Sequence, residues 1–205
     1  MSVQIIAEGL DQFESFVTDF PDISAQAAMM AINQTAERTA VPLARQRIGE
    51  QVDFPPNYLK DPSRLGVTQK ATRASLQAVV SARQRPTSLA RFAPAGSTPS
   101  TTRKGGVSVQ VKPGTIKQFQ RGFLVRLRAG ATNNNDNFNM GLAVRLKPGE
   151  SLHGTSGAKK LFNNVYLLYG PSVDQVFKTV ADDITPEVLD AMATEYLRQF
   201  TRLMG

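Results

Sequence analysis

The sequence contains no cysteine and no tryptophan, and it has one histidine among 205 residues. The absence of cysteine excludes a disulfide framework, thiolate metal sites and cysteine nucleophiles. Aromatic residues make up 7% of the chain and hydrophobic residues 41%, so we expect a core built mainly from aliphatic side chains. The length suits one domain, and we expect a single domain over residues 1–205.

Long hydrophobic runs are absent as well. The longest uncharged stretch, residues 23–36, contains Ser24, Gln26 and Asn33, whereas a helix that spans a bilayer needs about 20 predominantly apolar residues. The first residues lack the basic region that precedes the apolar run of a signal peptide. We therefore expect a soluble protein without membrane contact.

The residue types that carry catalysis are sparse. His153 lies in a Gly/Ser-rich loop, without the orienting partner that a general base requires. Residues 149–156 resemble a phosphate-binding loop but have Thr155 where the mechanism needs lysine. The adjacent pair Asp182 and Asp183 is typical of a helix terminus. The sequence predicts no enzyme, no cofactor and no metal site.

Helical periodicity marks both ends of the chain. Apolar residues recur at helical spacing over residues 10–17 and, with many alanines, over residues 22–49, where Pro42 should kink or divide the helix. At the C-terminus we expect a short helix ending near residue 180 and a second one starting at Thr185-Pro186, a capping residue followed by proline. The second helix would bury one apolar face, which contains Leu189, Met192, Tyr196, Phe200 and Leu203.

Period-2 alternation marks the middle of the chain. Residues 3–7 are expected to form a short strand, and apolar and polar residues alternate over 76–83, 107–111, 123–128 and 142–146. The four alternating runs predict one antiparallel sheet with one buried face and the arginines on the other face. Three polar loops are expected over residues 93–106, 129–141 and 148–158.

The predicted fold class is α+β, with N-terminal helices and a C-terminal helix packed on a mostly antiparallel sheet with long extended loops. Its parts are a helical part over residues 1–52, a basic β-rich part over residues 53–170 and C-terminal helices over residues 171–205.

Positive charge is concentrated in the middle of the chain. Residues 60–128 contain fourteen Lys/Arg and a single acid, Asp61, whereas residues 1–59 contain three bases and eight acids, and residues 131–205 seven and eight. A block of one sign must face water, a polyanion or an acidic protein surface. The predicted contact residues are Arg83, Arg85, Arg91, Arg103, Lys104, Lys112, Lys117, Arg121, Arg126 and Arg128.

The charge alone leaves the partner open. A nucleic-acid surface would gain free energy from counterion release, but stacking aromatics are few and no nucleic-acid-binding motif is present. An acidic protein neighbour fits because complementary potentials also steer protein assembly. The remaining alternative is a solvated face without a partner.

Three short sequences resemble the minor tail protein Z family of tailed bacteriophages. They are FPPNYL at residues 54–59, RLGV at 64–67 and AINQTA at 31–36, and the order of predicted elements is similar over most of the chain. The resemblance implies a virion structural protein of the head–tail neck, a tail-completion component that is assembled in the host cytoplasm. It implies no active site.

The resemblance also implies partners. They are further copies of the chain in a ring of six, the neighbouring tail terminator, tail tube or head-closure proteins, and genomic DNA in the channel. The contacts of a closed ring are heterologous, so the acidic N-terminal third of one copy could meet the basic middle of the next. Charge reversal at Arg126 and Arg128 is then expected to weaken assembly in a salt-dependent way. The alternative function is nonspecific DNA binding through the basic central segment.

Overall fold

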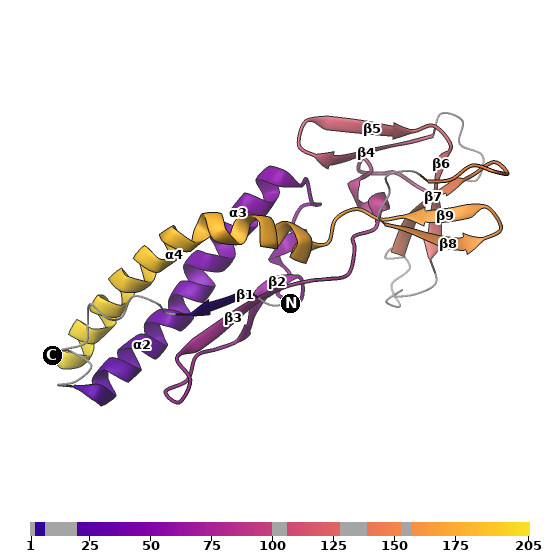
Figure 1. Cartoon of the computed structure of the whole chain (residues 1–205). Helices are drawn as coiled ribbons and strands as arrows, with labels where there is room; N and C mark the ends of the chain where they lie inside the picture. The colour runs from indigo at the N-terminus through magenta and orange to yellow at the C-terminus, as the bar shows by residue number, and fades with distance from the viewer. Residues whose placement is uncertain (1–2, 7–19, 100–105, 128–138, 153–156) are drawn as a thin grey trace. The chain divides into compact units, whose positions relative to one another are not determined.

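A computed structural model of the protein describes residues 3–6, 20–99, 106–127, 139–152 and 157–205. Helices and antiparallel strands make the fold α+β, as predicted (Figure 1). Contacts divide the chain into two compact units. Unit 1 comprises Met1–Ile48, Asn57–Gln84 and Val173–Gly205, and unit 2 comprises Gly49–Pro56 and Arg85–Ser172. The units are built from segments distant in sequence, unlike the three consecutive predicted parts, and the single domain stays a prediction.

Two long helices that lie side by side form the core of unit 1 (Figure 1). They are α2, Pro21–Thr35, and α4, Val173–Met204. The buried cluster between them contains Ala27, Ala28, Ala31, Tyr196 and Phe200. The alanines of α2 let the two backbones approach closely, and the aromatic rings of α4 fill the remaining space. The apolar face predicted for the C-terminal helix is therefore confirmed by this contact.

The helical run that begins with α2 continues through a change of hydrogen-bonding pattern. Ala36–Ala40 is π-helical, and α3 follows directly over Val41–Gln51. The change comes immediately before Pro42, which has no N–H to donate to the carbonyl four residues earlier. The helix predicted over residues 22–49 is thus confirmed, and the predicted division at Pro42 takes the form of a π-helical turn.

α4 is one continuous helix, whereas two helices were predicted. Pro186 lies inside it. The Thr185 hydroxyl donates a hydrogen bond of 2.8 Å to the carbonyl oxygen of Ala181 instead of capping a new helix. The predicted start at Thr185 is wrong, because Ile184 and Val188 are both buried and the packing of a continuous apolar face outweighs a local start signal.

Unit 1 also contains a three-stranded antiparallel sheet in the order β1-β3-β2. The strands are β1 (Val3–Ile6), β2 (Leu65–Gln69) and β3 (Gln77–Ala82). The strands predicted over residues 3–7 and 76–83 are confirmed within the described ranges. β2 was not predicted, and its pairing with β3 is interrupted by an irregularity between Val67 and Gln69. The helix predicted over residues 10–17 lies outside the described residues.

Unit 2 contains a hairpin and a four-stranded antiparallel sheet. The hairpin pairs β4 (Val107–Lys112) with β5 (Thr115–Phe119). The sheet has the order β6-β7-β9-β8 and consists of β6 (Gly122–Leu127), β7 (Asn139–Arg145), β8 (Ala158–Phe162) and β9 (Val165–Leu168). The four alternating runs are confirmed as strands, but the single sheet is wrong, since these strands belong to three sheets. Alternation identifies a strand and its faces but not its partner.

Both faces of β6 carry apolar contacts, which corrects the predicted separation of an apolar face from an arginine face. Leu124 is 2% exposed and shares its face with Arg126, because side chains two residues apart point the same way. On the other face, Phe123, Val125 and Leu127 pack around Ala143, Val165 and Leu167. Arg126 is thus an exposed residue at the end of a largely buried row.

The predicted loops are described in part. Residues 93–99 follow a short helical turn, Leu89–Phe92, and residues 100–105 lie outside the described ranges, as do 128–138 and 153–156. The loop predicted over residues 129–141 is too long at its end, because β7 already begins at Asn139.

Candidate interaction surface

The two units differ strongly in charge. Unit 2 contains thirteen Lys/Arg and four Asp/Glu, a net charge of +9, whereas unit 1 contains eleven and thirteen, a net charge of −2. The basic segment over residues 60–128 is therefore divided between them, with the boundary after Gln84. A concentration of one sign on one unit favours an anionic partner for that unit.

Arg83, a predicted contact residue, lies in unit 1 and supports its fold. It donates from Nη1 to the Tyr58 hydroxyl at 3.3 Å and from its backbone N–H to the carbonyl of Arg64 at 2.9 Å. The Arg64 guanidinium lies 3.9 Å from the centroid of the Tyr58 ring and 3.4 Å from the Asp61 carboxylate. Both arginines are thus held around a buried tyrosine rather than directed to a partner.

Acidic and basic segments also meet inside unit 1. Lys70 Nζ lies 2.6 Å from Glu37 Oε1, and Arg47 Nη2 lies 3.2 Å from Glu187 Oε1. Such exposed pairs contribute little to stability. The Lys70–Glu37 pair shows that charge complementarity between the N-terminal third and the basic middle is used in part within one chain.

The other described candidates lie in unit 2 and are exposed, namely Arg85, Arg91, Lys112, Lys117, Arg121 and Arg126. They are distributed over several elements and do not form one face of a sheet. Lys112 ends β4, and Lys117 lies in β5 with its Nζ 5.3 Å from the centroid of the Phe119 ring. Arg103, Lys104 and Arg128 lie outside the described residues.

Arg121 and Glu150 form a bidentate ion pair. The two guanidinium nitrogens Nη1 and Nη2 donate to the two carboxylate oxygens, each at 2.7 Å, and Glu150 also accepts from the backbone N–H of Lys147 at 2.8 Å. The hydrogen bond from Arg121, followed by that from Lys147, lowers the pKa of Glu150 to about 2. Arg121 therefore anchors the turn around Lys147 and has its charge already paired.

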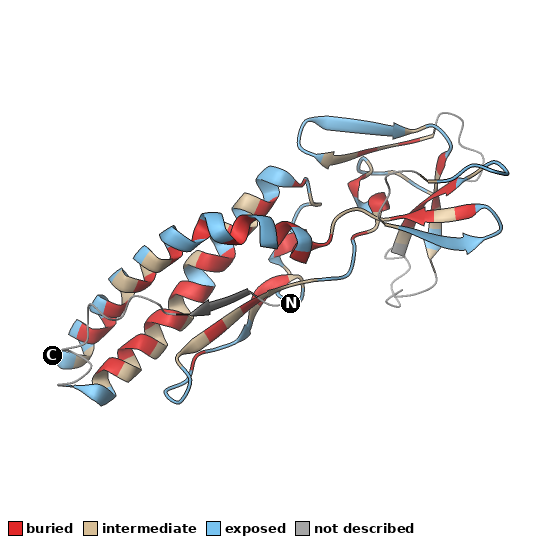
Figure 2. Ribbon diagram, viewed as in Figure 1, coloured by how far each residue is buried: buried red, intermediate tan, exposed pale blue. Residues whose placement is uncertain are grey.

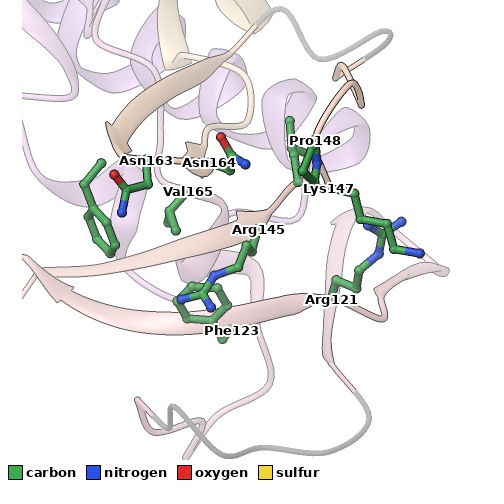
Figure 3. A pocket seen from close by; sticks show the side chains of 10 residues that line it. Arg121, Phe123, Arg145, Lys147, Pro148, Asn163, Asn164 and Val165 are labelled. Carbon is green, nitrogen blue, oxygen red and sulfur yellow. The ribbon is translucent and has the colours of Figure 1, made fainter.

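A cavity of about 770 Å³ adjoins this ion pair (Figure 3). Its charged and polar lining residues are Arg121, Arg145, Lys147, Asn163 and Asn164, and its aromatic ones are Phe123 and Phe162. Arg145 and Phe123 are neighbours on one face of the paired strands β6 and β7 (Figure 3). A cavity lined by cationic, amide and apolar side chains is suited to a ligand that has an anionic group next to an apolar part.

Arg145, Lys147, Lys159 and Lys160 were not predicted as site residues, because residues 131–205 taken together are nearly neutral. Residues 131–172 contain four Lys/Arg and two Asp/Glu, whereas residues 173–205 contain three and six. The basic block and the acidic block are thus separate in sequence, and their charges nearly cancel only when they are summed.

β8 forms an exposed edge of the four-stranded sheet (Figure 2). Its residues are all exposed, including Leu161 at 43% and Phe162 at 53%. Lys159 and Lys160 precede them. An edge strand presents backbone donors and acceptors to a partner, and lysines are a common device that limits indiscriminate pairing there. β8 thus combines apolar contact area with positive charge.

A second cavity in unit 2, of about 650 Å³, lies beside the hairpin. It is lined by residues of the FPPNYL sequence, by Phe92 and by Ile116, which is 69% exposed. The rings of Phe54 and Phe92 lie 5.6 Å apart. The lining of this cavity is mainly apolar, so the cavity is suited to apolar contact with a partner and not to catalysis.

No group of three or more His, Cys, Asp or Glu that could hold a metal ion occurs within the described ranges. Asp182 and Asp183 are exposed within α4, which corrects their expected place at a helix terminus. His153 lies outside the described residues. Among the helices that the structure describes, none combines the length and the apolar character needed to cross a membrane.

The chain matches no protein-family model, no curated protein and no solved structure. The kind of partner that the chain can bind is therefore inferred from its surface. Unit 2 offers cations, exposed apolar residues and strand edges, and this combination favours the binding of an acidic macromolecule.

Proposed function

We propose that this chain is a virion structural protein of a long-tailed bacteriophage. In this proposal it is a tail-completion component of the neck, which assembles as a ring at the head-proximal end of the tail and helps to join tail to head. It acts by binding neighbouring proteins and not by catalysis. The proposal rests on the resemblance of three sequence segments and on one structural observation.

That observation is the exposure of two strands in unit 2. Residues 115–118 of β5 are exposed and include Ile116, and all of β8 is exposed and includes Leu161 and Phe162. Large apolar side chains that gather on exposed strands are typical of interaction surfaces. A subunit of a larger particle needs such surfaces, because its neighbours cover them only after assembly.

The FPPNYL segment also has a structural role that suits a two-part subunit. It spans the boundary between the units, because unit 2 includes Pro56 and unit 1 resumes at Asn57. Asn57 has a left-handed backbone with φ of 63°, which asparagine tolerates better than most residues. Tyr58 and Leu59 are buried in unit 1. FPPNYL, one of the segments that resemble the family, is therefore a place where the chain passes from unit 2 into unit 1.

Nonspecific DNA binding is the second candidate, and the net charge of +9 on unit 2 favours it. Its affinity would come from phosphate contacts, so the logarithm of the binding constant would fall steeply with the logarithm of salt concentration. A neck subunit would instead bind protein assemblies of the particle, and would need little duplex affinity.

The test compares two ligands for the full chain. Tail-tube and terminator preparations from the particle that encodes the chain are mixed with it and sedimented, and duplex DNA is titrated separately. The proposal expects co-sedimentation with the tail preparation, reduced by Ile116→Ser. The control variant Gln34→Ala, in unit 1, should bind as the wild type does. Steeply salt-dependent duplex binding without binding to tail preparations would replace the proposal with the DNA-binding alternative.

A further inference from the structure

The C-terminal flank of the sequence divides into two oppositely charged surfaces that belong to different units. Arg145, Lys147, Lys159 and Lys160 lie in unit 2, on or beside the sheet. The six acids of residues 173–205 lie on α4 of unit 1. A flank that looks neutral in sequence therefore supplies two surfaces of opposite charge.

The basic surface consists of β8 and the cavity next to it, which share Phe162. Lys159 and Lys160 are exposed in β8, and no ion pair involves either of them among the described residues. Arg145 and Lys147 contribute from the cavity wall. We call this the β8 surface. Arg145 and Lys147 line the cavity together with Phe162, and Lys159 and Lys160 extend the positive charge along β8. Glu150, the carboxylate beside the cavity among the described residues, is paired with Arg121.

The acidic surface follows from the continuity of α4. Asp182, Asp183, Glu187 and Asp190 are exposed, with no base between Lys178 and Arg198. Because Pro186 does not end the helix, these acids form a stripe on its exposed side, opposite the buried Ile184 and Val188. Asp183 and Asp190 are seven residues apart, which is about 10 Å along the helix.

This acidic stripe is only partly used inside the chain. Glu187 pairs with Arg47, whereas Asp182, Asp183 and Asp190 make no ion pair within the described residues. Among the described acids of the N-terminal third, Glu37 is paired with Lys70 and Asp53 accepts a hydrogen bond from Gln110 at 2.9 Å, while Asp22 is exposed. Within the described residues, α4 therefore carries the main group of acids left for a partner.

We propose that the β8 surface of one copy binds the acidic stripe of α4 on a second copy. This inference rests on the proposed function, for which it names the contact between neighbouring subunits. The two surfaces differ, so the contact is heterologous. A linear assembly of copies therefore has one unoccupied β8 surface at one end and one unoccupied stripe at the other. Repetition of such a contact gives a closed ring or an open filament.

The apolar and charged parts of the β8 surface have separate roles in this contact. Leu161 and Phe162 lose exposed apolar area on docking, which supplies favourable free energy. The four cations oppose the carboxylates of the stripe and select its orientation, since charge complementarity governs specificity and association rate. Association is therefore expected to weaken when salt rises from about 20 mM to about 500 mM, because the Debye length falls from roughly 20 Å to about 4 Å.

A charge-exchange experiment with the full chain tests the proposal. One variant carries Lys159→Glu and Lys160→Glu, a second carries Asp183→Lys and Asp190→Lys, and a third carries all four changes. Self-association is measured by sedimentation velocity at low salt. Each of the first two variants should self-associate about tenfold or more weakly than the wild type, because docking would place like charges opposite each other.

Mixing the variants distinguishes docking between copies from a loss of folding. The first variant retains a native stripe and the second a native β8 surface, so an equimolar mixture should associate again into oligomers in which the two variants alternate, although neither variant does so alone. The four-fold variant should self-associate again, because its charges are exchanged. The control K60E/R73E makes the same change in net charge on unit 1 and should behave as the wild type.

Several results would overturn the inference. They are a wild type that stays monomeric at every concentration at low salt, variants that associate as the wild type does, and a mixture that does not associate. Loss of duplex binding in the first variant with unchanged self-association would assign the β8 surface to DNA. The proposed function is tested by a different measurement, the binding of the chain to tail preparations. If the chain does not bind them, the proposed function is wrong, whatever the result for self-association.

Discussion

The side-chain amide of Asn33 pairs with the backbone of Ala71 as a neighbouring strand would. Asn33 Nδ2 donates to the carbonyl oxygen of Ala71 at 3.0 Å, and the N–H of Ala71 donates to Asn33 Oδ1 at 2.8 Å. Asn33 lies on α2, and Ala71 is a buried residue just after β2. One side chain thus fastens the helix to the end of the sheet in unit 1.

Asn33→Ala is expected to lower the free energy of unfolding by about 1–3 kcal/mol, because it leaves a buried donor and a buried acceptor without partners. Urea denaturation of the full chain measures the change. Gln34→Ala, one residue along the same helix, should have an effect within about 0.5 kcal/mol. Equal effects of the two substitutions would show that the amide pairing contributes nothing specific.

The continuity of α4 predicts an unusual response at Pro186. Pro186→Ala should stabilise unit 1 by about 1–3 kcal/mol, since alanine restores an N–H to the helix and removes the clash that proline causes in a helix interior. Thermal denaturation followed by circular dichroism measures it.

Thr185→Ala is the informative companion. In a continuous helix the loss of this exposed hydroxyl should change stability by less than about 0.5 kcal/mol, whereas loss of a true N-cap costs about 1 kcal/mol. A destabilised Thr185→Ala together with a neutral Pro186→Ala would contradict the single helix and restore the two helices predicted from the sequence.

The ion pair of Arg121 with Glu150 predicts a specific dependence on pH. The folded-state pKa of Glu150 is about 2, below its ordinary value of 4.5. The ionised form is thus favoured by folding, and its stabilising contribution is fully present above about pH 4.5 and is lost as the pH falls toward 2. A carboxyl ¹³C titration by NMR should give a midpoint near 2 for Glu150.

Arg121→Gln removes the main cause of this shift. In that variant the pKa of Glu150 should move upward toward 4.5, while the backbone hydrogen bond from Lys147 retains part of the effect. An unchanged midpoint in Arg121→Gln would show that Arg121 does not hold the carboxylate in solution.

The exposed apolar residues of β8 predict a separation of folding from association. Leu161→Ser with Phe162→Ser should leave the unfolding transition nearly unchanged, because both side chains are largely exposed. The same change should weaken self-association, which light scattering at low salt measures. Ile116→Ser removes an even more exposed residue from β5 and should leave self-association intact. Equal loss in both variants would point to nonspecific apolar contact.

The sequence predicted local structure well where one pattern dominates. Alternation identified β3, β4, β6 and β7, and apolar residues at helical spacing identified the helical run that contains α2 and α3. It failed where distant contacts decide, as at Pro186, whose local start signal is outweighed by burial of Ile184 and Val188, and in the division of the strands among three sheets.

The candidate site was predicted less well, because the charged residues were grouped by their positions in the sequence and not by their positions in the fold. Arg83 belongs to the basic segment in sequence but supports Tyr58 inside unit 1. Lys159 and Lys160 belong to residues 131–205, whose net charge is close to zero because most of the acids of this segment lie on α4. The contacts in the folded chain, such as those of Arg83 with Tyr58 and of Arg121 with Glu150, separate the cations that stabilise the fold from those available to a partner.

Cryo-electron microscopy of intact particles that encode the chain decides whether it is an assembly subunit of the phage neck. We expect density for this fold as a ring at the head-proximal end of the tail, with β8 of each copy against α4 of the next. Density elsewhere in the particle, or none in particles that are complete and infectious, would contradict the proposed function.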